Sequence, residues 1–322
     1  MELVTKKKLV VVSGRANDLL AQEVCAHLGV RQGAVVLSTF ASGEIYARYG
    51  ESIRGSDVFI LQSHSEPIND RLMEQLILID AAKRASAKRI TAVVPFYGYS
   101  RQDKKTEGRE PITARLVADM LTVAGADRIV TVDLHQGQIQ GFFDMPVDHL
   151  TALPVLVPYL HRMIDGDNVV VSPDAGGVKR AQKFANHLGA DLAFIHKRRP
   201  HGTHNVAQAL EVVGDVAGRT CVLVDDIIDT GGTIAAAAEL LVARGAGDVY
   251  VVATHGIFSD PAVDRLKNAP IREVVVTNTL PIPDEKRWDG LQVLSIAEVI
   301  ADAIDAVFED TSVSDLFHGD NL

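Results

Sequence analysis

A glycine-rich turn between an apolar run and an Ala-rich stretch is the sharpest chemical feature of the sequence. Residues 221–224 are apolar, Asp225 and Asp226 follow, and residues 229–233 read Asp-Thr-Gly-Gly-Thr before a helical pattern that begins near Ile234. Glycines let backbone N–H groups face an anion, and the N-terminus of the next helix adds the positive end of its dipole. The two acids can accept hydrogen bonds from sugar hydroxyls. We therefore expect an anion-binding site here.

A simple helix cap is the alternative explanation for this turn. Thr233 would cap the helix and Asp229 would complement its dipole. That arrangement accounts for one acid and one threonine, but it leaves the other two acids and the paired glycines without a role. The sequence therefore favours a binding function.

Three consecutive cations follow a second apolar run. Lys197, Arg198 and Arg199 come directly after residues 192–195, and the polar, turn-forming stretch 200–204 follows them. A cationic loop of this kind can close over a phosphorylated substrate, exclude water and stabilise charge on a transferred group. A charge run at a strand end is often only a solvated face. The nearby anion turn favours the functional interpretation.

A charged segment lies between Arg101 and Arg109. Arginine offers a forked set of donors that suits phosphate. An exposed loop is the alternative, and we favour function for Arg101 and Gln102 more than for Lys104, Lys105 or Arg109.

The elements that position these residues alternate along the chain. Apolar runs rich in Val and Ile occur at 9–12, 58–61, 90–94, 129–132, 169–171, 221–224, 249–253 and 274–276, and amphipathic patterns occur at 72–85, 112–124 and 233–243. Alternating strands and helices indicate an α/β fold, and continuous apolar strands indicate largely parallel sheets covered on both faces. With 322 residues, two domains are expected.

Charge and composition exclude several classes of protein. A formal net charge of −10 argues against a nucleic-acid binder. The apolar run at 9–12 is broken at Ser13 and Arg15, so it predicts a buried strand rather than a signal peptide. Since no apolar run approaches the ~18 residues of a membrane span, we expect a cytoplasmic protein that does not contact a membrane. Cys25 and Cys221 form no CxxC pair and fit a reducing compartment.

A faint internal repeat suggests two related halves. Residues 10–13 are followed by a helical stretch ending Ala-His-Leu-Gly at Gly29, and residues 170–172 by one ending Asn-His-Leu-Gly at Gly189. The prolines near 150–158 suggest a boundary, so we expect domains at 1–152 and 153–322. The last segment would pack back on the first domain.

Several motifs together resemble one enzyme family. The turn at 229–233 resembles the ribose-phosphate loop of the type I phosphoribosyltransferase superfamily. Segments 95–105, 133–144, 172–177 and 277–281, in this order and over nearly the whole chain, resemble the ribose-phosphate diphosphokinases. The resemblance implies two tandem phosphoribosyltransferase-like α/β domains, ATP on the first and ribose 5-phosphate on the second. It also implies transfer of the diphosphoryl group of ATP to the C1 hydroxyl of ribose 5-phosphate, giving 5-phosphoribosyl 1-diphosphate and AMP.

The resemblance also assigns residues. ATP would contact Phe40, Ser42, Gly43, Glu44, Arg101 and Gln102. Ribose 5-phosphate would contact Asp225, Asp226, Asp229, Thr230, Gly231, Gly232 and Thr233. Lys197 and Arg199 would be catalytic, and Arg54 and Arg109 would bind regulatory phosphate or ADP. The family usually carries Asn or Asp where this chain has Ser42, which leaves selectivity for adenine open. A homo-oligomer, in the family a hexamer, is implied.

The implied cofactor is Mg²⁺, with His135 and Asp174 as ligands and Asp133 as a weaker one. Asp174 suits this hard ion, whereas imidazole suits softer metals, so His135 could instead contact phosphate or a metal-bound water. Asp133 would point to the same strand face as His135, and it could equally fix the imidazole tautomer.

Three other functions remain as alternatives. A non-catalytic regulatory homologue would be expected to lose the Lys-x-Arg pair, the metal residues or the turn, all of which are present here. A phosphoribosyltransferase that consumes the diphosphate needs only one such domain. A nucleic-acid or structural module is disfavoured by the charge and by the site motifs.

Overall fold

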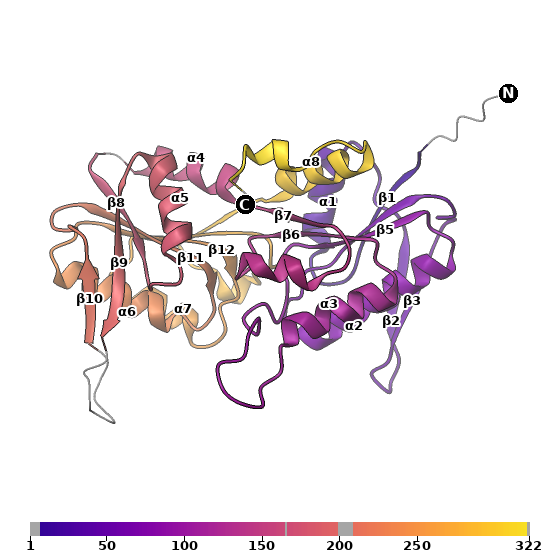
Figure 1. Ribbon diagram of the computed structural model, residues 1–322, viewed down its shortest axis with the longest axis horizontal. Coiled ribbons are helices and arrows are strands. Elements are labelled where there is room, and N and C mark those ends of the chain that lie inside the picture. The colour runs from indigo at the N-terminus through magenta and orange to yellow at the C-terminus, as the bar shows by residue number, and fades with distance from the viewer. Residues whose placement is uncertain (1–6, 165, 199–208, 321–322) are drawn as a thin grey trace. The chain divides into compact units, whose positions relative to one another are not determined.

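Strands and helices alternate in the computed structural model, which describes residues 7–164, 166–198 and 209–320 (Figure 1). Each apolar run named above lies within a strand, and the three amphipathic patterns fall on helices. The predicted α/β fold with largely parallel sheets is confirmed. The chain divides into two compact units. The first contains the chain up to Ala152, Thr279–Pro281 and the stretch from Ser295 onward, and the second contains Leu153–Asn278 and Ile282–Leu294.

The first unit is built on a five-stranded parallel sheet with the order β1-β4-β5-β6-β7. Its strands are β1 (Leu9–Ser13), β2 (Val35–Thr39), β3 (Ile45–Tyr49), β4 (Asp57–Leu61), β5 (Arg89–Val94), β6 (Arg128–Val132) and β7 (Val147–Leu150). Its helices are α1 (Asp18–His27), α2 (Ile68–Arg84), α3 (Thr113–Ala124), α8 (Ala297–Phe308) and the 3₁₀ helices η1 (Gly137–Phe142) and η3 (Ser314–Phe317). Strands β2 and β3 pair only with each other, as an antiparallel ribbon.

Helices cover the first sheet and bury its apolar side chains. Helices α2 and α3 lie side by side, and α1 packs against α8 (Figure 1). Val12, Ile60, Val94 and Ile129 from four neighbouring strands belong to one buried cluster with α2 and α3. This continuous apolar packing explains why the sequence runs are uniformly hydrophobic rather than alternating.

The second unit has a seven-stranded sheet with the order β10-β9-β8-β11-β12-β13-β14, in which only the β9–β10 pair is antiparallel. Its strands are β8 (Asn168–Ser172), β9 (Asp191–Arg198), β10 (Ala209–Val213), β11 (Thr220–Ile228), β12 (Val249–Gly256), β13 (Glu273–Thr277) and β14 (Leu291–Leu294). Its helices are α4 (Leu153–Met163), α5 (Val178–Leu188), α6 (Gly232–Ala243), α7 (Ala262–Asn268) and the 3₁₀ helix η2 (Asp284–Lys286).

The two units repeat one order of strands. Strands β8-β11-β12-β13-β14 follow each other in space as β1-β4-β5-β6-β7 do, and in each unit a strand pair stands between the first and second of these strands in the sequence. The faint sequence repeat marks the ends of α1 and α5, where Gly29 and Gly189 adopt the left-handed conformation that glycine tolerates. The repeat therefore reflects equivalent helix ends in two related units.

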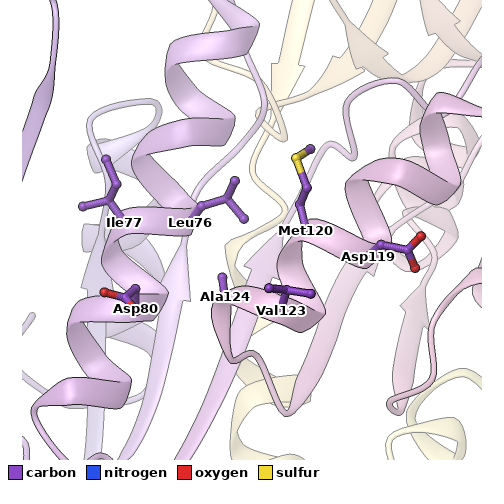
Figure 2. Close-up of a pocket in the computed structure, with 7 residues that line it drawn as sticks. All are labelled: Leu76, Ile77, Asp80, Asp119, Met120, Val123 and Ala124. Atoms are coloured by element: carbon purple, nitrogen blue, oxygen red, sulfur yellow. The ribbon is translucent and has the colours of Figure 1, made fainter.

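A groove of about 510 Å³ lies between α2 and α3 in the first unit. It is lined by Leu76, Ile77, Asp80, Asp119, Met120, Val123 and Ala124. Figure 2 shows Leu76 and Met120 on opposite sides of it, with Leu76 pointing toward α3. None of the residues assigned from sequence lines this groove. Within the described part of the chain, no helix combines the length and apolar character needed to cross a bilayer.

Candidate functional site

Strand β11 extends beyond its neighbour β8 and carries both acids of the predicted sugar site. Its pairing with β8 ends at Leu223, whereas its pairing with β12 continues through Asp225 to Ile228. The strand therefore extends beyond the apolar run at 221–224 and includes both acids. The hydrogen bonds between β11 and β12 join backbone groups. The pairing therefore continues at residues whose side chains are polar. Asp225 and Asp226 stand on a paired strand whose other edge is no longer covered by β8.

Arg180, on the first turn of α5, binds both acids. Its Nη1 lies 3.3 Å from Oδ1 of Asp225 and 3.0 Å from Oδ1 of Asp226. Asp226 is only 2% exposed. Because a buried carboxylate is stabilised only by close partners, Arg180 is the counter-charge that lets this pair of acids exist inside the unit.

The pKa of Asp225 is raised above the ordinary value of an aspartate. Burial is the main cause, and the charge of Asp226 and a hydrogen bond between the two side chains add to it. The charge of Arg180 acts in the opposite direction. Two adjacent carboxylates that share one cation therefore take up a proton more readily than a lone aspartate.

The turn after β11 places a left-handed glycine directly before the N-terminus of a helix. Gly231 has φ +70°, and α6 begins at Gly232 rather than near Ile234. A Cβ at position 231 would meet Cγ of Leu266 at 3.3 Å, so glycine is needed for both conformation and space. Arg265 of α7 donates to the carbonyl oxygen of Thr230 at 3.0 Å. Helix α7 therefore supports the turn from behind.

The helix-cap explanation for Thr233 is wrong. The residue that caps α6 is Gly231, and its hydrogen atom in place of a side chain provides no capping oxygen. Thr233 lies within the first turn of α6 and is exposed. The first N–H groups of α6 thus have no capping side chain at Gly231.

Asp174 lies in the turn between β8 and α5. Its Oδ1 accepts hydrogen bonds from the backbone N–H groups of Gly176, at 2.8 Å, and Gly177, at 3.0 Å. These bonds fix one carboxylate oxygen of Asp174. Among the described residues, no group of three or more His, Cys, Asp and Glu side chains is arranged to hold a metal ion.

The predicted cationic loop begins at the end of β9. Lys197 pairs with Leu210 of β10, and Arg198 pairs with Ala209. Arg199 lies outside the described residues. The described backbone therefore places Lys197 at the end of a hairpin.

In the first unit, the predicted adenine contacts lie at the tip of the β2–β3 ribbon. The N–H of Phe40 donates to the carbonyl of Glu44, and Gly43 has φ +92°. The hydroxyl of Ser42 donates to Oε2 of Glu44 at 2.8 Å. The Phe40 ring is 55% exposed and meets Tyr46 edge-on, with centroids 6.0 Å apart. An aromatic face is thus presented to solvent beside polar groups.

Arg101 and Gln102 occupy an exposed turn between β5 and α3. The N–H of Gln102 donates to the carbonyl of Tyr99 at 2.9 Å. Oε1 of Gln102 accepts a 2.5 Å hydrogen bond from the hydroxyl of Thr113. The turn is thereby tied to the start of α3. Arg54 is exposed on the loop before β4, and Arg109 is exposed farther along the connection between β5 and α3.

The geometry expected for Asp133 and His135 is wrong. Strand β6 ends at Val132, and Asp133 has φ +38°, so the two residues do not alternate along a strand. Oδ2 of Asp133 accepts a hydrogen bond from the N–H of Ala152 at 2.9 Å. Both residues belong to the loop that leads into η1.

Sequence reasoning missed Arg180 and Arg265. Arg180 comes six residues after Asp174 in the first turn of the next helix, a place that faces the strand ends of a parallel sheet. That spacing is a usable signal. No sequence pattern marks Arg265, because its contact with Thr230 depends on how α7 packs beside α6.

Two family models match the chain. The N-terminal domain of ribose phosphate pyrophosphokinase matches residues 9–125. The phosphoribosyl synthetase-associated domain matches residues 197–318.

Full-length relatives extend these matches. A ribose-phosphate pyrophosphokinase of Bifidobacterium longum is 60% identical over 315 residues, which cover 97% of this chain and 93% of that protein. One of Streptomyces avermitilis is 59% identical over 313 residues, 97% of each chain. The crystal structure of phosphoribosylpyrophosphate synthetase from Mycobacterium smegmatis superposes with a TM-score of 0.90 at 57% identity, covering 94% of this chain and 100% of that one. The chain therefore belongs to the ribose-phosphate pyrophosphokinase family.

Proposed function

We propose that this member of the ribose-phosphate pyrophosphokinase family transfers the diphosphoryl group of ATP to the C1 hydroxyl of ribose 5-phosphate. The products are 5-phosphoribosyl 1-diphosphate and AMP, and they serve nucleotide biosynthesis. The observation that carries the proposal is the anion turn at Gly231 beside the Asp225–Asp226 pair. Acceptors for sugar hydroxyls on β11, followed by a turn for a phosphate, match a phosphorylated sugar.

The second unit is the proposed ribose 5-phosphate domain. The 5-phosphate binds to the backbone N–H groups of Gly231, Gly232 and Thr233 and to the hydroxyl of Thr230. Asp229 lies at the start of the same turn. Asp225 and Asp226 accept hydrogen bonds from the ribose hydroxyls. The raised pKa of Asp225 sets a condition for this role, because the carboxyl group is an acceptor through both oxygens only when it is deprotonated.

The first unit is the proposed ATP domain. Phe40 stacks on adenine, and Ser42, Gly43 and Glu44 give the polar contacts around it. The exposed aromatic face supports this assignment, because a base can bury it without any rearrangement of the unit. Arg101 and Gln102 contact the phosphates from their turn. Arg54 and Arg109 are proposed contacts for phosphate or ADP effectors.

Mg²⁺ is the proposed cofactor. Asp174 fits it, because one carboxylate oxygen is fixed by two N–H groups while the other can face an ion. Magnesium usually keeps several waters and takes one or two carboxylates with substrate phosphates, so a single strong protein ligand suffices. His135, with Asp133, is proposed nearer the phosphates. When bound, the ion would neutralise charge on the transferred group.

Lys197 and Arg199 are the proposed catalytic cations. The C1 hydroxyl attacks the β-phosphorus of ATP and AMP leaves, so the reaction needs alignment and positive charge more than a covalent intermediate. The position of Lys197 at the end of a hairpin supports a role for this segment in covering the phosphates.

Assembly and location complete the proposal. We expect a homo-oligomer, a hexamer by family likeness, and no nucleic-acid or membrane partner. A cytoplasmic location is supported by Cys25 and Cys221, which are buried and free, as in a reducing compartment.

The test is AMP release from purified protein with ATP, Mg²⁺ and ribose 5-phosphate, each omitted in turn. Release that requires all three, with an equal amount of phosphoribosyl diphosphate, supports the proposal. Lys197→Ala serves as the inactive control, since it should still bind ATP. Binding of both substrates without release would contradict the proposal and favour the regulatory homologue.

A further inference from the structure

The loop after β4 in the first unit is filled by its own side chains. Strand β4 is the second strand of its parallel order, as β11 is in the second unit, so this loop matches the anion turn in position. Instead of a glycine pair it carries Gln62, Ser63 and His64, which are at most 1% exposed. The loop after β4 is therefore filled by its own buried side chains, whereas the corresponding turn after β11 is the proposed phosphate site.

His64 makes two hydrogen bonds through its ring. Nδ1 lies 3.0 Å from the backbone nitrogen of Gly98, whose N–H can only donate. Nε2 lies 2.8 Å from Oε1 of Gln75 on α2. Nδ1 must therefore be unprotonated and Nε2 must carry the proton. Burial lowers the pKa of His64 to about 4, which keeps this tautomer neutral.

The backbone of His64 contacts the same segment. Its N–H donates to the carbonyl of Phe96 at 3.1 Å. A Cβ at position 98 would meet Cβ of His64 and Cδ1 of Ile68, each at 2.8 Å, so Gly98 has to be glycine for this approach. Residue 64 thus holds the chain at Phe96 and at Gly98.

We propose that His64 is a positioning residue for ATP, which fixes the turn that carries Arg101 and Gln102 through the N–H of Gly98. This inference rests on the proposed ATP contacts of that turn. Tyr99, next to Gly98, has φ +62°, a conformation that non-glycine residues adopt only when their surroundings impose it. Gln102 closes the turn onto Tyr99 and ties its far end to Thr113 of α3. The near end is held at Gly98, where the imidazole is the acceptor.

A pair of isosteric substitutions separates positioning from simple packing. In His64→Asn, the amide oxygen takes the place of Nδ1, so it keeps the Gly98 bond and loses the Gln75 bond. In His64→Gln, the amide takes the place of Nε2, so it keeps the Gln75 bond and loses the Gly98 bond. Asparagine is the smaller residue and leaves the larger cavity, so packing alone predicts the greater damage in His64→Asn.

We expect the opposite order for ATP. His64→Gln should raise KM for ATP about fivefold to tenfold, as expected for one lost buried hydrogen bond, and should leave KM for ribose 5-phosphate unchanged. His64→Asn should keep KM for ATP within about twofold of the native value even where its Tm is lower. Equal KM values for ATP in both variants, or a larger effect in His64→Asn, would overturn the inference.

Arg101→Ala separates this inference from the proposed function. If Arg101→Ala raises KM for ATP and His64→Gln does not, only the role of His64 is wrong. If neither changes KM for ATP, the ATP assignment of the turn is itself wrong. Should His64→Gln fail to fold, ¹⁵N-histidine spectra of the native protein give a second test. A proton on Nδ1 of His64 at neutral pH would refute the Gly98 bond and the proposal with it.

Discussion

Nη1 of Arg180 lies 3.0 Å from Oδ1 of the buried carboxylate of Asp226, and the same nitrogen lies 3.3 Å from Asp225. One cation on a helix thus serves two acids on a strand. Removal of one partner from a buried ion pair leaves an uncompensated charge, which costs far more than loss of a surface pair. Arg180 therefore controls the charge state of the proposed sugar site.

Arg180→Met should weaken the binding of ribose 5-phosphate in a pH-dependent way. The pKa of Asp225 is already raised, and loss of the Arg180 charge should raise it further. A larger share of the carboxyl is then protonated near neutral pH, so KM for ribose 5-phosphate should rise about tenfold for each pKa unit. It should improve as pH increases, because deprotonation restores the acceptors. Arg180→Lys keeps the charge and should show a smaller shift. Parallel pH profiles for the native protein and Arg180→Met would contradict this prediction.

Gly231→Ala should damage the turn before α6. Position 231 has φ +70°, and the added methyl group would press on Leu266. We expect a loss of about 1–2 kcal/mol in the free energy of unfolding, together with a large rise in KM for ribose 5-phosphate. Gly218→Ala is the matched control, since Gly218 has φ +74° but open space around its Cα. It should lower stability without a change in KM. Equal changes of KM for ribose 5-phosphate in both variants would show that the turn does not bind this substrate.

Phe40→Ala should weaken the binding of ATP without lowering the stability of the protein. Stacking of a base on an aromatic ring contributes about 1–3 kcal/mol, so KM for ATP should rise about tenfold or more. The ring is 55% exposed, and its removal should leave Tm nearly unchanged. Leu19→Ala on α1, where Leu19 is 72% exposed, is the control for loss of an exposed apolar side chain. An unchanged KM for ATP in Phe40→Ala would show that the ribbon tip does not bind the base.

Asp310→Asn should destabilise the first unit above pH 4 and not near pH 2. Asp310 lies 2.6 Å from Nζ of Lys7 and 2.6 Å from Nη1 of Arg89. The hydrogen bond from Lys7, followed by that from Arg89, lowers the pKa of Asp310 to about 2. A lowered pKa in the folded state means that the contribution is complete above the ordinary pKa of aspartate and is lost as pH falls toward 2.

Urea titrations at several pH values measure this contribution. The difference in free energy of unfolding between the native protein and Asp310→Asn should shrink between pH 4 and pH 2. Asp315→Asn, at an exposed position of the same C-terminal segment, should show no such trend. A difference that stays constant with pH would mean that the ion pairs of Asp310 contribute nothing.

Sequence patterns located the strands well because the parallel sheets are buried on both faces. They placed the end of β11 too early, because the apolar run stops at Val224. Backbone pairing with β12 continues to Ile228. The β2–β3 ribbon was missed as a pair of strands, because its side chains are half exposed and lack a continuous apolar run. The residue types of the proposed sugar site were assigned from motif and spacing alone. The Arg180 contacts were not, because they depend on where α5 begins relative to β11.

Strand β11 lies between β8 and β12, well inside the second sheet. Backbone hydrogen bonds of such interior strands exchange with solvent only when a whole cooperative unit opens, whereas turns open locally at little cost. At Asp225 and Asp226 the backbone of β11 is still paired with β12, whereas residues 229–231 follow the end of this pairing and can open without it. In the proposed site, the turn for the phosphate can therefore adjust to its ligand and release it while the pairing of β11 with β12 stays intact.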